Sequence, residues 1–218
     1  MDIEASVKGL YVGTSGWSYP TWRPDFYPAG TKNEDFLRYY SERFSTVELN
    51  TTGYRLPREE LFERWAGQTP RAFKFAPKMN AYRNLNTATF QERVSLLGDR
   101  LGPIRAVVTW AQDEGLLELI LGSFDPNTRL AFDFRHDSWE GIETELPPNA
   151  VRVNELGGDA PFRYVRLREP PYEDAELGDW ASRLRPLIEQ GTEVYCYLRH
   201  EDEPTAPRYA TRLIELLS

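Results

Sequence analysis

Residues 46–50 read T-V-E-L-N, and the apolar side chains Val47 and Leu49 alternate with the polar side chains Glu48 and Asn50. This alternation is typical of a β-strand that buries one face. If both faces of the strand are covered, Glu48 becomes a buried carboxylate, which is costly unless it is paired. The arrangement of the other strands therefore decides what Glu48 does.

Seven further segments share the β-branched and aromatic composition of strands: 10–14, 72–76, 104–110, 129–135, 150–154, 162–168 and 192–199. Amphipathic segments at 33–44, 174–190 and 205–217 predict helices. Strands that alternate with helices form parallel sheets, and eight of them predict an α/β fold of the TIM type, a (β/α)₈ barrel. We expect residues 1–218 to form a single domain.

The barrel is expected to be short and irregular on one side. Only E-L-G-G-D-A-P, residues 155–161, separates the sixth strand from the seventh, which is too short for a helical crossover. Residues 136–149 also lack helical periodicity. The chain has 218 residues, whereas such barrels have about 250. We therefore predict degenerate helices around strands five to seven.

Composition limits the partners and the location. The 26 basic and 34 acidic residues give a net charge of −8, which disfavours general attraction to nucleic-acid backbones or anionic membranes. No segment approaches the roughly 20 apolar residues of a membrane span. The single cysteine, Cys196, excludes an intrachain disulfide and fits a reducing compartment. We expect a cytoplasmic protein; the sequence specifies neither a cofactor nor an oligomeric state.

The strand pattern also predicts which side chains face the barrel interior. In a barrel, the clearly apolar positions of each strand face the helices and the alternate positions face inward. This rule turns polar side chains inward on five strands: Glu48, Asn50, Lys74, Asp133, Arg135, Tyr164, Arg166, Arg168, Tyr195, Tyr197 and Arg199. Such charges either act in a site or merely pair with one another, and residues at the carboxyl ends of barrel strands are typically functional.

Two of the inward carboxylates, together with His136 just beyond the fifth strand, are candidates for acid–base chemistry. His136 exchanges protons near neutral pH, and Glu48 or Asp133 could orient it or act as the second acid or base. A structural Asp–Arg pair explains part of the same pattern. His136, His200 and the two carboxylates could also bind a metal, but two histidines without ligand spacing are weak evidence, so we predict no metal site.

A second group is expected to hold the substrate. Guanidinium groups bind phosphate and carboxylate in a bidentate manner, so the inward arginines indicate a small anionic ligand. The loop G-T-S-G-W, residues 13–17, could present backbone N–H groups to an anion or simply form a tight turn. Its tryptophan could cap the core or stack on a sugar or base. The predicted binding residues are Ser15, Trp17, Asn50, Lys74, Arg135, Arg168 and Tyr197.

Several blocks of the sequence resemble those of a known family. Y-V-G-T-S-G-W-S-Y-P-T-W (11–22), F-K-F-A-P-K (73–78), F-D-F-R-H-D-S-W (132–139) and Y-V-R-L-R (164–168) are similar to the YecE-like family, also called domain-of-unknown-function family 72. The resemblance implies a TIM barrel and brings no established reaction. In the family, an aromatic residue usually stands where this chain has Gly53, so the site wall is expected to be more open.

The sequence thus favours an enzyme that acts by acid–base chemistry on a small anionic compound, phosphorylated or sugar-like, at the carboxyl-terminal face of the barrel. The alternative is a binding module without catalysis, for a nucleotide, a nucleic-acid end or a metabolite. Aromatic stacking and a basic groove would suffice for that role.

Overall fold

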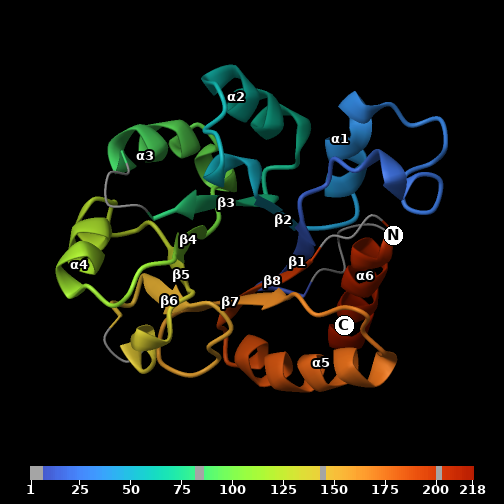
Figure 1. Cartoon of the computed structure of the whole chain (residues 1–218). Helices are drawn as coiled ribbons and strands as arrows, with labels where there is room; N and C mark the ends of the chain where they lie inside the picture. The colour runs from blue at the N-terminus through green and yellow to red at the C-terminus, as the bar shows by residue number, and fades with distance from the viewer. Residues whose placement is uncertain (1–6, 82–85, 143–145, 200–202) are drawn as a thin grey trace.

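The computed structural model describes residues 7–81, 86–142, 146–199 and 203–218. Within them, eight strands form one sheet in which all neighbouring strands are parallel. The strand order β6-β5-β4-β3-β2-β1-β8-β7 brings the two edge strands side by side and nearly closes the barrel (Figure 1). The strands are β1 (Leu10–Ser15), β2 (Thr46–Leu49), β3 (Lys74–Asn80), β4 (Ile104–Val108), β5 (Leu130–Phe134), β6 (Ala150–Arg152), β7 (Phe162–Leu167) and β8 (Glu193–Leu198). The predicted TIM-type barrel is confirmed.

Helices surround this barrel (Figure 1). The predicted helices at 33–44, 174–190 and 205–217 are present, the first of them divided into two shorter helices. The α-helices are α1 (Phe36–Ser41), α2 (Glu59–Gln68), α3 (Thr87–Ser95), α4 (Glu114–Gly122), α5 (Asp174–Glu189) and α6 (Thr205–Leu217). Short 3₁₀ helices are η2 (Pro20–Trp22), η3 (Asn33–Asp35), η4 (Thr51–Gly53), η5 (Gly98–Arg100) and η6 (Asp137–Trp139).

Local sequence sets the ends of several helices. The side chains of Asn86 and Asp113 accept hydrogen bonds from backbone N–H groups in the first turns of α3 and α4. Glu173 and Glu176 form a reciprocal capping box at the start of α5. After α5 the chain turns at Gly191, whose φ of +87° suits glycine. Among the described residues, no helix is both long and apolar enough to cross a membrane.

The core lies between the sheet and the helices and contains the outward positions of the strands. Val47 and Leu49 are 0% and 1% exposed, as an apolar outward face predicts. Glu48 is also 0% exposed, because the inward face of β2 is covered by the other strands of the barrel. Both faces of the T-V-E-L-N strand are therefore covered, and Glu48 is a buried carboxylate.

The barrel is irregular where the sequence predicts it. The described residues between β5 and β6 form no α-helix, and no helix separates β6 from β7. The β6–β7 seam is bridged by Asn154, which has a φ of +67°. Its backbone N–H donates to Tyr164 O at 2.9 Å, its Nδ2 donates to Arg166 O at 3.2 Å, and its Oδ1 accepts from Arg166 N at 2.6 Å. One side-chain amide thus replaces part of a strand ladder.

Replacement of Asn154 should loosen this seam. Asn154→Ala leaves the backbone N–H and C=O of Arg166 without their side-chain partner. It also places alanine at a positive φ, where its Cβ is strained and no side-chain hydrogen bond compensates. We expect a loss of about 2–4 kcal/mol in the free energy of unfolding, measured by urea denaturation. Asn154→Gly removes the same side chain without the backbone strain and should be less destabilising. Wild-type stability in both variants would show that the side chain does not hold the seam.

Candidate functional site

Glu48 is the centre of a buried polar network inside the barrel. Its Oε2 accepts hydrogen bonds from Ser15 Oγ at 2.8 Å and Arg166 Nη2 at 2.9 Å, and its Oε1 accepts from Tyr164 Oη at 2.8 Å. Arg166 Nε lies 2.9 Å from Oε1, although its N–H is not aligned for a hydrogen bond. Arg105 Nη1 lies 3.4 Å from Oε2. Residues from β1, β2, β4 and β7 therefore meet on one carboxylate.

Asp133, on β5, is the second carboxylate of the network. Its Oδ2 accepts from Arg105 Nε at 2.8 Å, Arg105 Nη2 at 2.6 Å and Arg135 Nη2 at 2.7 Å. Arg166 Nη1 lies 3.7 Å from the same oxygen. Three arginines thus share two carboxylates, which leaves the network with one positive charge in excess.

The electrostatics keep Glu48 ionised. Burial alone would raise the pKa of Glu48, but the charges of Arg105 and Arg166, together with the hydrogen bonds from Arg166 and Tyr164, lower it from 4.5 to about 2. Burial and the neighbouring Glu48 charge raise the pKa of Tyr164 well above its usual value, so the phenol stays protonated and donates. A carboxylate with so low a pKa is a weak base at neutral pH.

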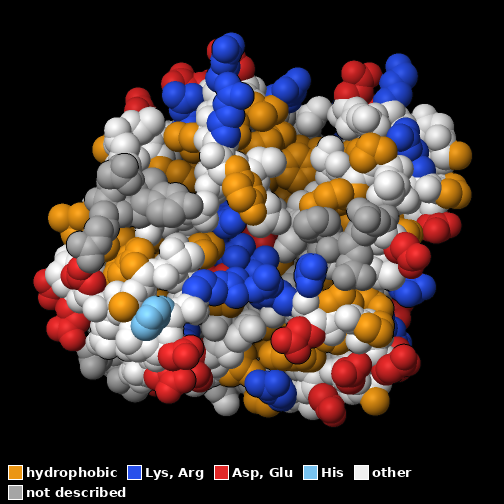
Figure 2. Space-filling model, in the orientation of Figure 1, with side chains coloured by type: hydrophobic (Ala, Val, Ile, Leu, Met, Phe, Trp, Pro, Cys, Tyr) orange, Lys and Arg blue, Asp and Glu red, His pale blue; other side chains and the backbone are white. Residues whose placement is uncertain are grey.

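A cavity of about 820 Å³ opens above this network, at the carboxyl ends of β5 to β8. Figure 2 shows Lys and Arg side chains gathered at the centre of this face, over the region of β6, β7 and β8, with acidic atoms between them. Asp133 forms part of the cavity floor. Six arginines line the cavity: Arg135, Arg152, Arg166, Arg168, Arg183 and Arg199.

Three of these arginines, Arg168, Arg183 and Arg199, form no ion pair with a carboxylate among the described residues, and Arg183 packs on Trp180 instead. Arg168 follows β7 and Arg199 follows β8; neither pairs with a carboxylate anywhere in the described part of the chain, and Arg199 Nη1 donates only to Arg168 O at 3.4 Å. Burial, and then the nearby Arg135 and Arg166, lower the pKa of Arg168. Like charges are therefore crowded at the mouth of the barrel, an arrangement that an anion would relieve.

The opposite wall of the cavity is formed by α5 and the segment before it. Glu169, Tyr172, Glu176, Asp179 and Trp180 line this side. The guanidinium of Arg183 lies 4.2 Å from the centroid of the Trp180 ring, a cation–π contact. The cavity is thus basic on the barrel side, whereas the helix side carries acidic and aromatic groups together with Arg183.

The structure brings several of the predicted site residues together. Ser15, Glu48, Asp133 and Arg135 are in the buried network, and Arg168 is at its mouth. Tyr197 lies within the barrel, where its ring is 5.0 Å from that of Tyr164 and its hydroxyl bonds Thr46 Oγ1 at 2.8 Å.

Other predicted residues lie elsewhere. His136 is exposed, its Nδ1 lies 2.9 Å from Ser138 Oγ, and it does not line the cavity. Trp17 packs edge-to-face on Trp65, and Asn50 precedes η4; neither lines the cavity. The structure therefore does not place the imidazole beside Glu48 or Asp133.

Lys74 faces inward as predicted, but it lies at the other end of the barrel. It begins β3 and lines a separate cavity of about 410 Å³ with Arg129, Glu193 and Tyr195. Its Nζ donates to Asp99 O at 2.6 Å. The alternation of side chains predicts which face of the strand a residue occupies, but it does not predict how far along the barrel axis that residue lies.

Sequence reasoning missed Arg105 altogether. It counted Arg166 among the inward charges, but it named neither Arg166 nor Tyr164 as a catalytic or binding residue. Arg105 alternates with the apolar Ile104 and Ala106, so the parity rule applied to β4 would have found it. Asn154 gave no such signal, because its role depends on a positive φ. No cluster of three or more potential metal ligands occurs in the described ranges, and His200 lies outside them.

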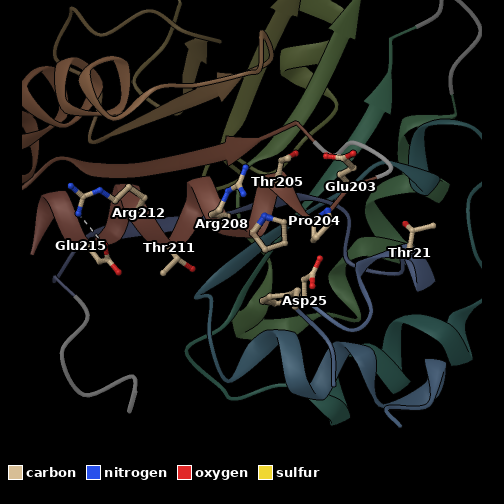
Figure 3. A pocket seen from close by; sticks show the side chains of 11 residues that line it. Thr21, Asp25, Glu203, Pro204, Thr205, Arg208, Thr211, Arg212 and Glu215 are labelled. Atoms are coloured by element: carbon tan, nitrogen blue, oxygen red, sulfur yellow. Dashed lines mark hydrogen bonds and ion pairs between the residues drawn. The ribbon is translucent and has the colours of Figure 1, made fainter. Parts of the chain in front are cut away.

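A second large cavity, of about 840 Å³, lies between α6 and the segment after β1 (Figure 3). Of its two arginines, Arg212 pairs with Asp174 at 2.7 Å and with Glu215 at 3.1 Å, and Arg208 packs on the ring of Tyr209. Asp25 and Glu203 add further negative charge. This cavity has no unbalanced positive charge, so the barrel mouth is the better candidate site.

The fold and the site define a TIM-type barrel protein with an arginine-lined mouth. The family model described as "Protein of unknown function DUF72" matches residues 11–218, and the chain belongs to this family. The UPF0759 protein YecE of Escherichia coli (strain K12) is 33% identical over 102 residues, which are 43% of this chain and 35% of YecE. The UPF0759 protein YunF of Bacillus subtilis (strain 168) is 32% identical over 76 residues, which are 35% of this chain and 25% of YunF.

A solved structure supports the fold over nearly the whole chain. The crystal structure of a DUF72 family protein (EF0366) from Enterococcus faecalis V583 matches with a TM-score of 0.77 at 15% identity and covers 95% of this chain and 97% of that one. The likeness confirms the barrel architecture.

The buried carboxylate should dominate the acid stability of the protein. Glu48→Gln leaves Arg105 and Arg166 short of a counter-charge, so we expect a loss of about 3–5 kcal/mol at pH 7 in urea denaturation. Because the folded pKa is lowered to about 2 from 4.5, the stabilisation by Glu48 is complete above pH 4.5 and is lost as the pH falls towards 2. The difference between wild type and variant should shrink over that range.

Asp174→Asn is the matched control for this prediction, because Asp174 pairs with Arg212 at the surface. It should change the stability little at any pH. A Glu48→Gln protein as stable as the wild type at pH 7 would contradict the proposed role of the ion pairs.

Proposed function

We propose that this protein binds a small anionic compound, carrying phosphate or carboxylate groups, in the cavity at the carboxyl ends of β5 to β8. The observation that carries the proposal is the pair of arginines, Arg168 and Arg199, that line the cavity without an acidic partner among the described residues. Guanidinium groups at such a site bind oxyanions through paired, charge-assisted hydrogen bonds.

The size and shape of the cavity favour a small molecule over a polymer. Its volume of about 820 Å³ is in the range of small-molecule sites, and it lies at the end of a barrel where such sites occur. The net charge of −8 would weaken the approach of a nucleic-acid backbone to the rest of the surface. A nucleic-acid end remains the alternative, and the experiment below includes it.

We further propose that the two buried carboxylates position the arginines and do not move protons in partnership with His136. Glu48 is held ionised by two arginines, and His136 is exposed and bonded to Ser138. General acid–base catalysis needs groups within hydrogen-bond reach of the reacting proton and with a pKa near the working pH. The site is better suited to recognition, and any reaction there would depend on electrostatic stabilisation by the arginines.

Removal of Arg168 and Arg199 should weaken anion binding without unfolding the protein. At constant ionic strength, pyrophosphate should raise the melting temperature of the wild type, since a ligand of the native state stabilises it. In the double variant Arg168→Met/Arg199→Met the affinity should fall by about 10- to 100-fold. Because the two arginines are crowded by like charge, the unliganded variant should be at least as stable as the wild type.

Arg64→Met is the control, since Arg64 is an exposed arginine of α2 outside the cavity. It should leave the pyrophosphate effect unchanged. A short single-stranded DNA with a 5′-phosphate serves as the competitor. Citrate is tested in the same way as a carboxylate ligand. If neither pyrophosphate nor citrate raises the melting temperature of the wild type, the proposal fails. If the DNA displaces pyrophosphate and citrate does not, the nucleic-acid alternative is favoured.

A further inference from the structure

We propose that the ligand carries a hydroxyl group close to its anionic group, and that Asp133 accepts a hydrogen bond from that hydroxyl. This inference rests on the proposed function and names the ligand class for the same cavity. The compounds in question are phosphorylated polyols and sugars or hydroxy acids. The two oxygens of the Asp133 carboxylate differ in their hydrogen bonds.

All hydrogen bonds that the described residues donate to the Asp133 carboxylate fall on one oxygen. Oδ2 accepts two hydrogen bonds from Arg105 and one from Arg135, and Arg166 Nη1 lies 3.7 Å away. Oδ1 receives no hydrogen bond from any residue within the described ranges. A carboxylate has about four acceptor positions, so the unused oxygen retains its full capacity.

The unused oxygen is open to the cavity. Asp133 lines the cavity, and 8% of its side chain is exposed. Among the described side chains, the buried polar atoms that lack a partner belong to Arg93, Arg166 and Thr205, and Asp133 Oδ1 is not one of them. We infer that Oδ1 is the exposed part of this side chain. Oδ1 is therefore a hydrogen-bond acceptor on the cavity floor, surrounded by arginines that favour an anionic ligand.

The charges around Oδ1 select the kind of donor that can bind it. Arg105, Arg135 and Arg166 surround the carboxylate, so an ammonium group brought to Oδ1 would meet three positive charges. A second anionic group would be repelled by Oδ1 itself. A hydroxyl group avoids both penalties because it is neutral and donates one hydrogen bond. Chemistry at this position therefore favours an alcohol.

Arg135 lies between the expected position of the anionic group and that of the hydroxyl group. It lines the cavity, has a side chain 36% exposed, and donates to Asp133 Oδ2 at 2.7 Å. An anionic group held by Arg168, Arg199 and Arg135 would thus lie near Asp133. A hydroxyl on a carbon close to the phosphate or carboxylate would be placed to reach Oδ1.

Matched ligands test the inference directly. Binding of glycerol 3-phosphate, n-propyl phosphate and the di-O-methyl ether of glycerol 3-phosphate would be measured by isothermal titration calorimetry, with malate and succinate as the carboxylate pair. We expect glycerol 3-phosphate or malate to bind about tenfold more tightly than its partner without the hydroxyl. The ether, which accepts but cannot donate, should bind no better than n-propyl phosphate.

The variant Asp133→Asn should reduce the preference for the hydroxyl-bearing ligand to less than about threefold. The amide oxygen of the new side chain would accept the hydrogen bonds of Arg105, so its NH₂ group, which cannot accept from a hydroxyl, would face the cavity. Glu63→Gln, at an exposed carboxylate of α2 outside the cavity, should keep the full preference. If Asp133→Asn does not fold, the comparison of alcohol and ether in the wild type decides the question alone.

The outcomes separate this inference from the proposed function. A preference in the phosphate pair only, or in the carboxylate pair only, supports the inference and identifies the anionic group. Equal binding of all three phosphates and of both dicarboxylates would overturn the hydroxyl contact and leave anion binding intact. No binding of any of them would overturn both.

Discussion

The ion pairs of Glu48 with Arg166 and Arg105 constrain the rest of the barrel interior. A carboxylate that is 0% exposed is tolerated only while its counter-charges and hydrogen bonds stay in place. Its partners come from β1, β4 and β7, and Arg105 extends the network to Asp133 on β5. A shift of any of these strands by one residue would turn its polar side chain towards the apolar layer. We infer that the network favours a single register, because any other register would leave its buried charges without partners.

The weakest part of the barrel wall is linked to this network. β7 carries both Tyr164 and Arg166, and β6 reaches β7 through Asn154. The amide of Asn154 holds the backbone of Arg166 on both sides, so the guanidinium that binds Glu48 is fixed by a side chain across the seam. A ladder of regular strands would hold it more simply.

The sequence predicted the fold, and it named about half of the residues that the structure brings together at the candidate site, for clear physical reasons. Alternation in the strands identified Glu48, Asp133 and Arg135 as inward, because a period of two specifies the face of a strand. It could not assign Lys74 to the correct end of the barrel, since height depends on the stagger between strands. His136 was misleading for a different reason: it lies beyond the strand, where the turn into η6 and Ser138 determine its direction. Asn154 depends on a backbone angle that composition does not reveal.

The balance of charges explains why the site is built from arginines and carboxylates together. Two carboxylates cannot neutralise three arginines, and Arg168 and Arg199 add positive charge that the described residues leave unpaired. Without Glu48 and Asp133, five guanidinium groups would repel one another too strongly to share one barrel mouth. With them, the inner arginines are held rigidly and the outer ones remain available. The carboxylate in T-V-E-L-N thus balances part of the positive charge that the arginines bring into the barrel of an acidic protein, and we propose that the unused oxygen of Asp133 lets the cavity distinguish an alcohol from a bare anion.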